Sequence, residues 1–248
     1  MEHAATAPVL VLSPHLDDAV LSAWSVLGGD EDVLVVNVYA GVPDPGPPPR
    51  WDALAGATDR RDLMEARLEE DRAALALAGR SAVYLPFLDR HYRDGGAPDV
   101  TEVAAAIQSA ARAASMIYAP GGIGGHADHL LVRDAALALG GSHGFAVRIY
   151  AELPYAVRFG WPGWVTGQPP GPADADWDHW LRDAPTQPSR ESGEARRLSD
   201  EEMSAKIAAM RRYRSQFPLL NQGAIGLLEH PAVLPWEVAW NAGLSAGA

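Results

Sequence analysis

The stretch VLVLSPHLDDAVLSAW, residues 9–24, joins an apolar run to a polar break and then to a second apolar run. The first run is short, rich in β-branched residues and bounded by Pro14, which is typical of a strand buried on both faces. The second run has helical spacing and leads to Gly28 and Gly29, a common helix ending. With the apolar run at 32–41, the N-terminus predicts a strand–helix–strand unit.

The same alternation continues along the chain. Helical patterns and short apolar runs take turns, at 58–79, 82–87, 99–114, 116–120, 128–141 and 147–153. Parallel neighbours in a sheet need crossover connections, and helices supply them. We therefore expect a doubly wound, Rossmann-like α/β fold with a mainly parallel sheet and helices on both faces.

The 248 residues fit a single domain, 1–248, with two segments that break the rhythm. The segment 42–57 is rich in proline, and 160–198 combines six prolines with a group of tryptophans. Either segment could be a disordered linker, but the tryptophans favour partly ordered, variable loops near a ligand site. A last helix is predicted at 199–217, where Ser199 and Glu202 have the spacing of a capping box.

Composition narrows the classes of partner and cofactor. Thirty-two acidic against 20 basic residues give a net charge of −12, which disfavours nucleic acid. The chain has no cysteine, so any metal must be held by histidine and carboxylate. Because it has neither an apolar run of about 18 residues nor a basic leader, we expect a cytoplasmic chain without a membrane span. Homo-oligomerisation stays open.

Two polar clusters each follow a predicted strand. The first holds His15, Asp17 and Asp18, and the second holds His126, Asp128 and His129. Each cluster alone has a structural explanation, because aspartates cap helices and histidines are often satisfied by local hydrogen bonds. The carboxyl ends of parallel strands, however, meet at one edge of a sheet. We therefore expect the clusters to converge in one site.

Two histidines and one carboxylate are the ligand set of many catalytic zinc sites, in which a fourth position is left for water. The metal lowers the pKa of that water and polarises a bound carbonyl. A second carboxylate must then lie near the water, and adjacent aspartates meet this need. Nearby glycines would let the backbone approach a substrate closely, at positions 121, 122, 124 and 125.

The motifs PHLDD (14–18) and HADH (126–129) resemble the paired motifs of the LmbE-like, or PIG-L, family of zinc-dependent N-acetyl-sugar deacetylases. The resemblance extends to Arg67 and Glu70, to AELPY (151–155) and to Lys206 with YRSQ (213–216). Leu16 and Ala127 stand where the family usually has proline, and Ala19 stands where glutamate is common. None of these departures removes a ligand or the base.

The resemblance implies a role for each residue of the two clusters. It implies three metal ligands, His15, Asp18 and His129. Asp17 would be the general base, and His126 would stabilise the oxyanion and help to protonate the leaving amine, with Asp128 orienting it. The cofactor would be Zn²⁺, with Fe²⁺ as the alternative. The substrate would be a small N-acetylated amino sugar or its glycoside, of the N-acetylglucosamine type, and the products acetate and a free amine.

Other readings of the same residues remain open at this point. Two histidines and a carboxylate also form the site of non-haem iron oxygenases, although those that use this spacing resemble jelly-roll barrels. Paired aspartates after a first strand resemble signalling receiver domains, and a non-catalytic sugar-binding module is a further alternative. Arg67 and Glu70 could form an ion pair on a helix surface. Weaker candidates for sugar contacts are Arg50, Arg60, Arg61, His91, Tyr92, Arg93, Glu152 and Tyr155.

Overall fold

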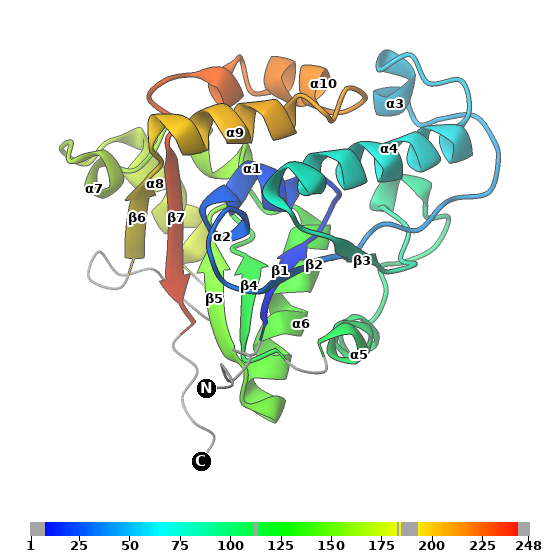
Figure 1. The fold of residues 1–248 in the computed structure, drawn as a ribbon, viewed down its shortest axis with the longest axis horizontal. Coiled ribbons are helices and arrows are strands. Elements are labelled where there is room, and N and C mark those ends of the chain that lie inside the picture. The colour runs from blue at the N-terminus through cyan, green and yellow to red at the C-terminus, as the bar shows by residue number, and fades with distance from the viewer. Residues whose placement is uncertain (1–7, 112–113, 183, 185–192, 243–248) are drawn as a thin grey trace.

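The computed structural model of the chain describes residues 8–111, 114–182, 184 and 193–242. A seven-stranded sheet runs through its centre in the order β3-β2-β1-β4-β5-β7-β6, with helices around it (Figure 1). Five strands are parallel, namely β1 (Val9–Ser13), β2 (Val33–Asn37), β3 (Ala82–Tyr84), β4 (Met116–Pro120) and β5 (Ala146–Tyr150). The expected mainly parallel α/β fold is confirmed.

Two further strands were not predicted. β7 (Trp236–Asn241) pairs antiparallel with β5, and β6 (Gly193–Arg197) pairs antiparallel with β7. β6 lies at the sheet edge, and its last four residues are exposed. Its charged side chains suit an edge strand, because charges there oppose pairing with another chain.

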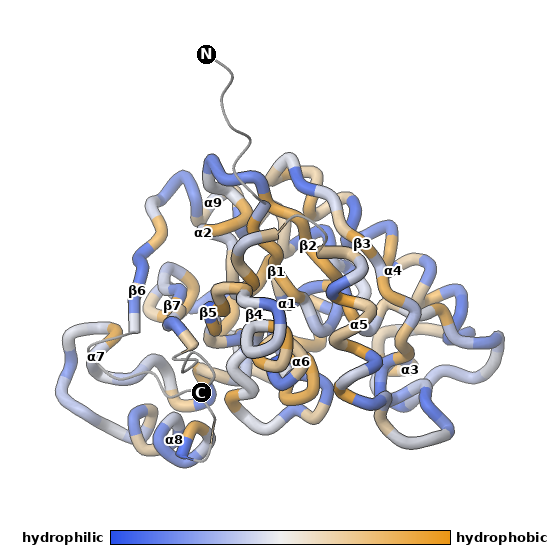
Figure 2. Tube along the Cα trace, turned by 90° about the horizontal axis from the view of Figure 1, so that it is seen from below, coloured by the Kyte–Doolittle hydropathy of each residue, from blue (hydrophilic) through white to orange (hydrophobic). Residues whose placement is uncertain are grey.

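The helices form a layer on each face of the sheet (Figure 2). On one face lie α2 (Trp24–Leu27), α4 (Arg60–Leu75) and α9 (Asp200–Met210), and on the other lie α5 (Val100–Ala110) and α6 (Ala127–His143). All five residues of β1 are buried between these layers, as its apolar run predicts. The predicted capping box is confirmed at the start of α9, where Ser199 and Glu202 each accept from the other's backbone N–H.

Both proline-rich segments contain short helices. The segment 42–57 holds α3 (Arg50–Leu54), and 160–198 holds α7 (Gly163–Thr166), α8 (Pro172–Leu181) and β6, while its residues 183 and 185–192 lie outside the described part. After α9 the chain forms α10 (Phe217–Gly223). The described part of the chain also contains four short 3-10 helices, η1 (Ala76–Ala78), η2 (Arg90–Tyr92), η3 (Tyr155–Val157) and η4 (Leu227–Glu229). Within the described ranges, no helix combines the length and the apolar character needed to cross a bilayer.

The helical pattern at 17–29 is interrupted. α1 (Asp18–Ser22) ends at Ala23, whose φ of −133° is not helical, and α2 begins at the next residue. The carboxylate of Glu237 accepts hydrogen bonds from the backbone N–H groups of Trp24 and Ser25, both at 2.8 Å. Glu237 is in turn paired at 2.8 Å with the ammonium group of Lys206, which is fully buried. A carboxylate 213 residues away thus holds the start of the second helix.

This buried ion pair generates a stability prediction. Burial would raise the pKa of Glu237, but Lys206 outweighs it and holds that pKa below its ordinary value. Lys206→Met leaves a buried carboxylate without its counter-charge, so we expect the free energy of unfolding to fall by about 3–5 kcal/mol in urea titrations at pH 7. Arg196→Met, which removes the exposed ion pair with Glu202, should change it by less than about 1 kcal/mol. Equal effects of the two substitutions would contradict the prediction.

Candidate active site

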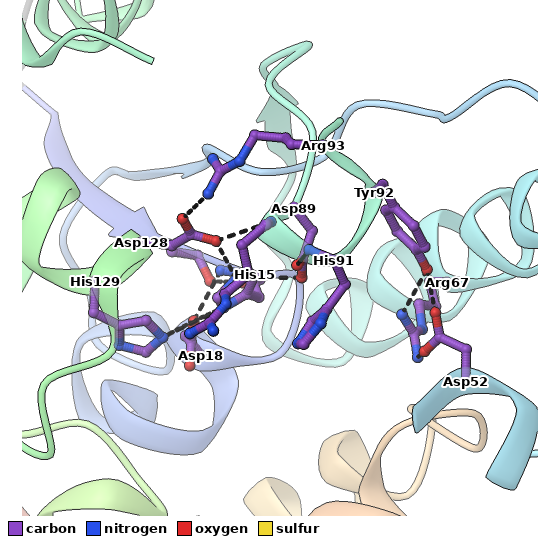
Figure 3. Close-up of polar contacts among 12 residues, drawn as sticks. His15, Asp18, Asp52, Arg67, Asp89, His91, Tyr92, Arg93, Asp128 and His129 are labelled. Atoms are coloured by element: carbon purple, nitrogen blue, oxygen red, sulfur yellow. Dashed lines mark hydrogen bonds and ion pairs between the residues drawn. The ribbon is translucent and has the colours of Figure 1, made fainter. Parts of the chain in front are cut away.

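Three donor atoms from the two polar clusters meet at the carboxyl edge of the sheet (Figure 3). Nδ1 of His15 lies 3.3 Å from Nε2 of His129 and 3.4 Å from Oδ2 of Asp18, and the last two atoms are 3.3 Å apart. Ligands at about 2.0–2.1 Å from a tetrahedral zinc ion lie about 3.3–3.4 Å from one another. The three atoms therefore fit a tetrahedral divalent cation that keeps a fourth position free.

Strand pairing explains how these residues meet. β1 and β4 are parallel neighbours, with Val9 opposite Met116 and Val11 opposite Tyr118. Their carboxyl ends therefore lie at the same edge of the sheet, with the first cluster directly after β1. In the second cluster, His126 immediately precedes α6, and Asp128 and His129 lie in the first turn of this helix. The predicted convergence of the two clusters is confirmed.

Asp17 and His126 line a cavity beside these donors, and each has a buried polar atom without a hydrogen bond. Neither Oδ2 of Asp17 nor Nδ1 of His126 has a hydrogen-bond partner among the described residues. The Asp17 side chain makes no capping bond to α1, so helix capping does not account for it. Burial, together with the Asp18 carboxylate, raises the pKa of Asp17 to about 7. Burial, together with the two neighbouring histidines, lowers the pKa of His126 to about 4.

Asp128 lies behind His15. Its Oδ2 is 3.4 Å from Nε2 of His15, and its Oδ1 accepts a hydrogen bond of 2.6 Å from Arg93. The resemblance implied that Asp128 orients His126, but its carboxylate is hydrogen-bonded to His15, to Arg93 and to the backbone N–H of Arg90. Burial would raise the pKa of Asp128, yet His15 and Arg93 hold it well below its ordinary value. A carboxylate at Nε2 fixes the tautomer that leaves Nδ1 free to bind a metal.

Glu152 lies in the same way behind His129. Its side chain is fully buried, and it accepts hydrogen bonds from the backbone N–H groups of Gly121 and Gly122. Its Oε1 lies 3.4 Å from Nδ1 of His129, which leaves Nε2 of that ring for the donor triad. Glu152 was a candidate for sugar contacts, but it does not line the cavity, and its carboxylate lies close to Nδ1 of His129 without a hydrogen bond to it.

Asp89 is a site residue that the sequence reasoning missed. Its Oδ2 lies 3.4 Å from Nε2 of His15, and the residue lines the cavity. The ring of Tyr39 stacks on His15 at 5.8 Å between centroids. Asp89 follows the predicted strand at 82–87, so the same strand-end rule that found the other two clusters points to it as well.

Arg67 belongs to a second polar group that lines the cavity, and Figure 3 shows this group apart from the residues around His15. Its guanidinium donates to Oδ1 of Asp52 at 2.7 Å and to the hydroxyl of Tyr92 at 3.2 Å, and that hydroxyl donates to Asp52 at 2.6 Å. The alternative of a surface ion pair between Arg67 and Glu70 does not hold, because Arg67 is buried and pairs with the buried carboxylate of Asp52. Glu70 instead accepts hydrogen bonds from the backbone and hydroxyl of Ser215.

The remaining weaker candidates divide into two groups. His91, Tyr92 and Tyr155 line the cavity. Arg60 and Arg61 contact Asp44 instead, Arg50 begins α3 on the surface, and Arg93 binds Asp128. In the turn after β4, residues 122, 124 and 125 have positive φ values of 76°, 84° and 73°, which explains why glycine occupies these positions. Gly124 also lines the cavity.

The family model for PIG-L, the GlcNAc-PI de-N-acetylase, matches residues 10–139. The chain belongs to the PIG-L family. The 2'-N-acetylparomamine deacetylase of Streptomyces fradiae is 33% identical over 169 residues, which cover 59% of this chain and 57% of that protein. The match thus spans less than two thirds of the length of this curated relative.

Solved structures of deacetylases are similar over nearly the whole chain. The deacetylase of the A40926 pseudoaglycone superposes with a TM-score of 0.73 and 26% identity, covering 95% of this chain and 96% of that one. The zinc-inhibited form of teicoplanin deacetylase gives a TM-score of 0.72 at 26% identity, covering 96% of this chain and 100% of that one. Both likenesses extend beyond the family match, which covers residues 10–139.

The contact between Glu152 and His129 generates a prediction about metal affinity. Glu152→Gln removes the negative charge behind His129 and weakens the control of its tautomer. We expect the dissociation constant for Zn²⁺, measured by competition with a chromogenic chelator, to rise by about 10- to 100-fold. Glu194→Gln, a change on the exposed edge strand, is the control and should leave it unchanged. Unaltered affinity in folded Glu152→Gln would show that this carboxylate does not support the metal site.

Proposed function

We propose that the chain is a metal-dependent N-deacetylase that hydrolyses the acetamide of an N-acetylated amino sugar or its glycoside. The carrying observation is the triad of His15, Asp18 and His129 with zinc-like spacing, beside the unpartnered atoms of Asp17 and His126. Membership of the PIG-L family supports this reading, as do similar proteins named as deacetylases of 2'-N-acetylparomamine, of the A40926 pseudoaglycone and of teicoplanin. The products would be acetate and a free amine.

The triad would hold a divalent cation, and Zn²⁺ is favoured because the donor set is nitrogen-rich and its spacing is tetrahedral. Fe²⁺ is the alternative. When bound, the cation supplies a Lewis acid that polarises the acetamide carbonyl and lowers the pKa of water. Asp17, Asp18 and Asp128 are all buried at or near the triad. Buried carboxylates are usually paired with a cation or bound to a metal, so this group of acidic side chains favours a bound cation.

The proposed steps follow from what the residues beside the triad can reach. Asp17 accepts the proton of the attacking water through its unpartnered oxygen. His126 donates a hydrogen bond to the carbonyl oxygen as negative charge develops on it. When the carbon–nitrogen bond breaks, the proton held by Asp17 returns to the leaving nitrogen, assisted by His126. Asp128 and Glu152 hold the two ligand histidines in orientation throughout.

The alternative functions account for less of the site. An iron oxygenase shares the ligand set, but the fold is an α/β sheet rather than a jelly roll. A receiver-like or sugar-binding module would not explain Asp17 and His126, or the carboxylates of Asp128 and Glu152 behind the two histidines.

The general base is tested by Asp17→Asn. The variant keeps the three donor atoms, so we expect metal content to stay at one ion per chain by mass spectrometry. It loses the proton acceptor, so kcat for acetate release should fall by about 10²- to 10⁴-fold. Asp30→Asn, outside the cavity lining, should retain wild-type turnover. Full activity in Asp17→Asn would assign the base elsewhere.

The metal is tested by removal and return. Chelator-treated protein should release no acetate, and one equivalent of Zn²⁺ or of anaerobic Fe²⁺ should restore turnover. Stoichiometric addition matters, because a zinc-inhibited form of teicoplanin deacetylase exists. Acetate release without oxygen would also separate hydrolysis from oxygenase chemistry. Undiminished activity in protein shown to be metal-free would contradict the proposal.

A further inference from the structure

The cavity changes character with distance from the metal triad. It has a volume of about 690 Å³ and is polar where Asp17, His126 and the triad meet it. Away from these groups one wall is apolar, and it is formed by Trp51 of α3 and by four residues on and after α10, Leu220, Ala224, Ile225 and Leu227. One cavity therefore joins a hydrolytic centre to a hydrophobic wall.

Ile225 is the most unusual residue of this wall. Its side chain is 91% exposed, and its φ of 55° makes it the one non-glycine residue with positive φ within the described ranges. Such a backbone is strained for a β-branched residue, and strain of this kind gathers at ligand sites. Solvent exposure gives an isoleucine no packing that would offset the strain. Contact with a ligand would.

Trp51 faces the same space and is held in place. It is 39% exposed, and its indole ring lies 3.8 Å from the position that a Cβ on Gly223 would take. The next residue, Asp52, is locked by the buried ion pair with Arg67. α3 is therefore anchored through its buried side while Trp51 stays open to the cavity, next to the end of α10.

Size and charge indicate what the wall contacts. Ligand cavities of about 300–1,000 Å³ enclose drug-sized molecules, whereas an N-acetylhexosamine has only about 15 non-hydrogen atoms. The sugar alone leaves part of this cavity unfilled. Asp89 belongs to the site itself, through its contact with His15. Of the other charged lining residues, Arg67 is paired with Asp52, and Arg90 and Arg158 outnumber Asp176. Charge therefore does not select a cationic group, and the apolar wall favours an uncharged one.

We propose that Trp51 and the 220–227 segment form a subsite for an apolar, aromatic aglycone attached to the N-acetylated sugar. The inference rests on the proposed deacetylase function and narrows its substrate class. The sugar's acetamide would lie at the triad, and the aglycone would pack between the indole of Trp51 and the side chain of Ile225.

The test compares two substrates in several variants. We expect the kcat/KM for phenyl N-acetyl-β-glucosaminide to exceed that for the methyl glycoside by about 10-fold or more in the wild type. Trp51→Ser and Ile225→Asn should each lower this phenyl-to-methyl ratio at least about threefold. Leu54→Asn is the matched control, because Leu54 is an exposed apolar residue of α3 that does not line the cavity. Its ratio should equal that of the wild type.

Ile225→Asn also guards against misfolding as an explanation. Asparagine tolerates positive φ better than isoleucine does, so the variant should melt no lower than the wild type. A ratio near one in the wild type, or a ratio unchanged in both wall variants, would overturn the subsite. So would a preference for the 2-aminoethyl glycoside over the phenyl glycoside.

A binding measurement separates this inference from the proposed function. Phenyl and methyl β-glucoside lack the acetamide and cannot be deacetylated, so calorimetry with them reads the subsite alone. Tighter binding of the phenyl compound, reduced in Ile225→Asn, supports the subsite even if no N-acetyl compound releases acetate. Acetate release from N-acetyl substrates combined with equal binding of the two glucosides supports the deacetylase and overturns the subsite.

Discussion

The parallel pairing of β1 with β4 is the constraint on which the site depends. The two strands are more than 100 residues apart in the chain, yet they are neighbours in the sheet, with Leu10 opposite Ile117. From β1 the chain proceeds to β2 on one side, while β4 lies on the other. The sheet therefore reverses its direction of growth at this point, where α/β folds open a crevice. The polar residues that follow β1 and β4 fall into that crevice from opposite sides.

That position concentrates negative charge, and the fold offsets only part of it. Asp17, Asp18 and Asp128 are buried, while the arginines nearby are already engaged, Arg93 with Asp128 and Arg67 with Asp52. Buried carboxylates are costly unless they are paired or bind a metal. A divalent cation at the triad would supply further counter-charge. The metal would therefore stabilise the fold locally as well as supply its chemistry.

The sequence predicted what local pattern encodes. The parallel strands β1 to β5 lie in apolar runs, and the strand-end rule located both polar clusters. Each of these predictions depends only on a short segment of the chain. The sequence did not predict β6 and β7, because these antiparallel strands depend on pairing between distant residues, such as Ala195 and Val238. The sequence did not predict the helix break at Ala23 either, because the next residue, Trp24, is hydrogen-bonded to the distant carboxylate of Glu237. Likewise, no helix periodicity reveals that Arg67 turns inward to Asp52, since that contact exists only once α3 packs on α4.

Buried polar contacts also decide how freely the apolar wall can vary. Asp71 accepts hydrogen bonds from Asn37, Tyr84 and Tyr213, and so joins β2 and β3 to the segment after α9. Glu70 holds the next turn through Ser215. The chain that leads to Ile225 is thus fastened to the sheet before it reaches the cavity. Because these anchors are separate from the metal triad, exposed wall residues can change the aglycone that is accepted while the hydrolytic geometry stays the same.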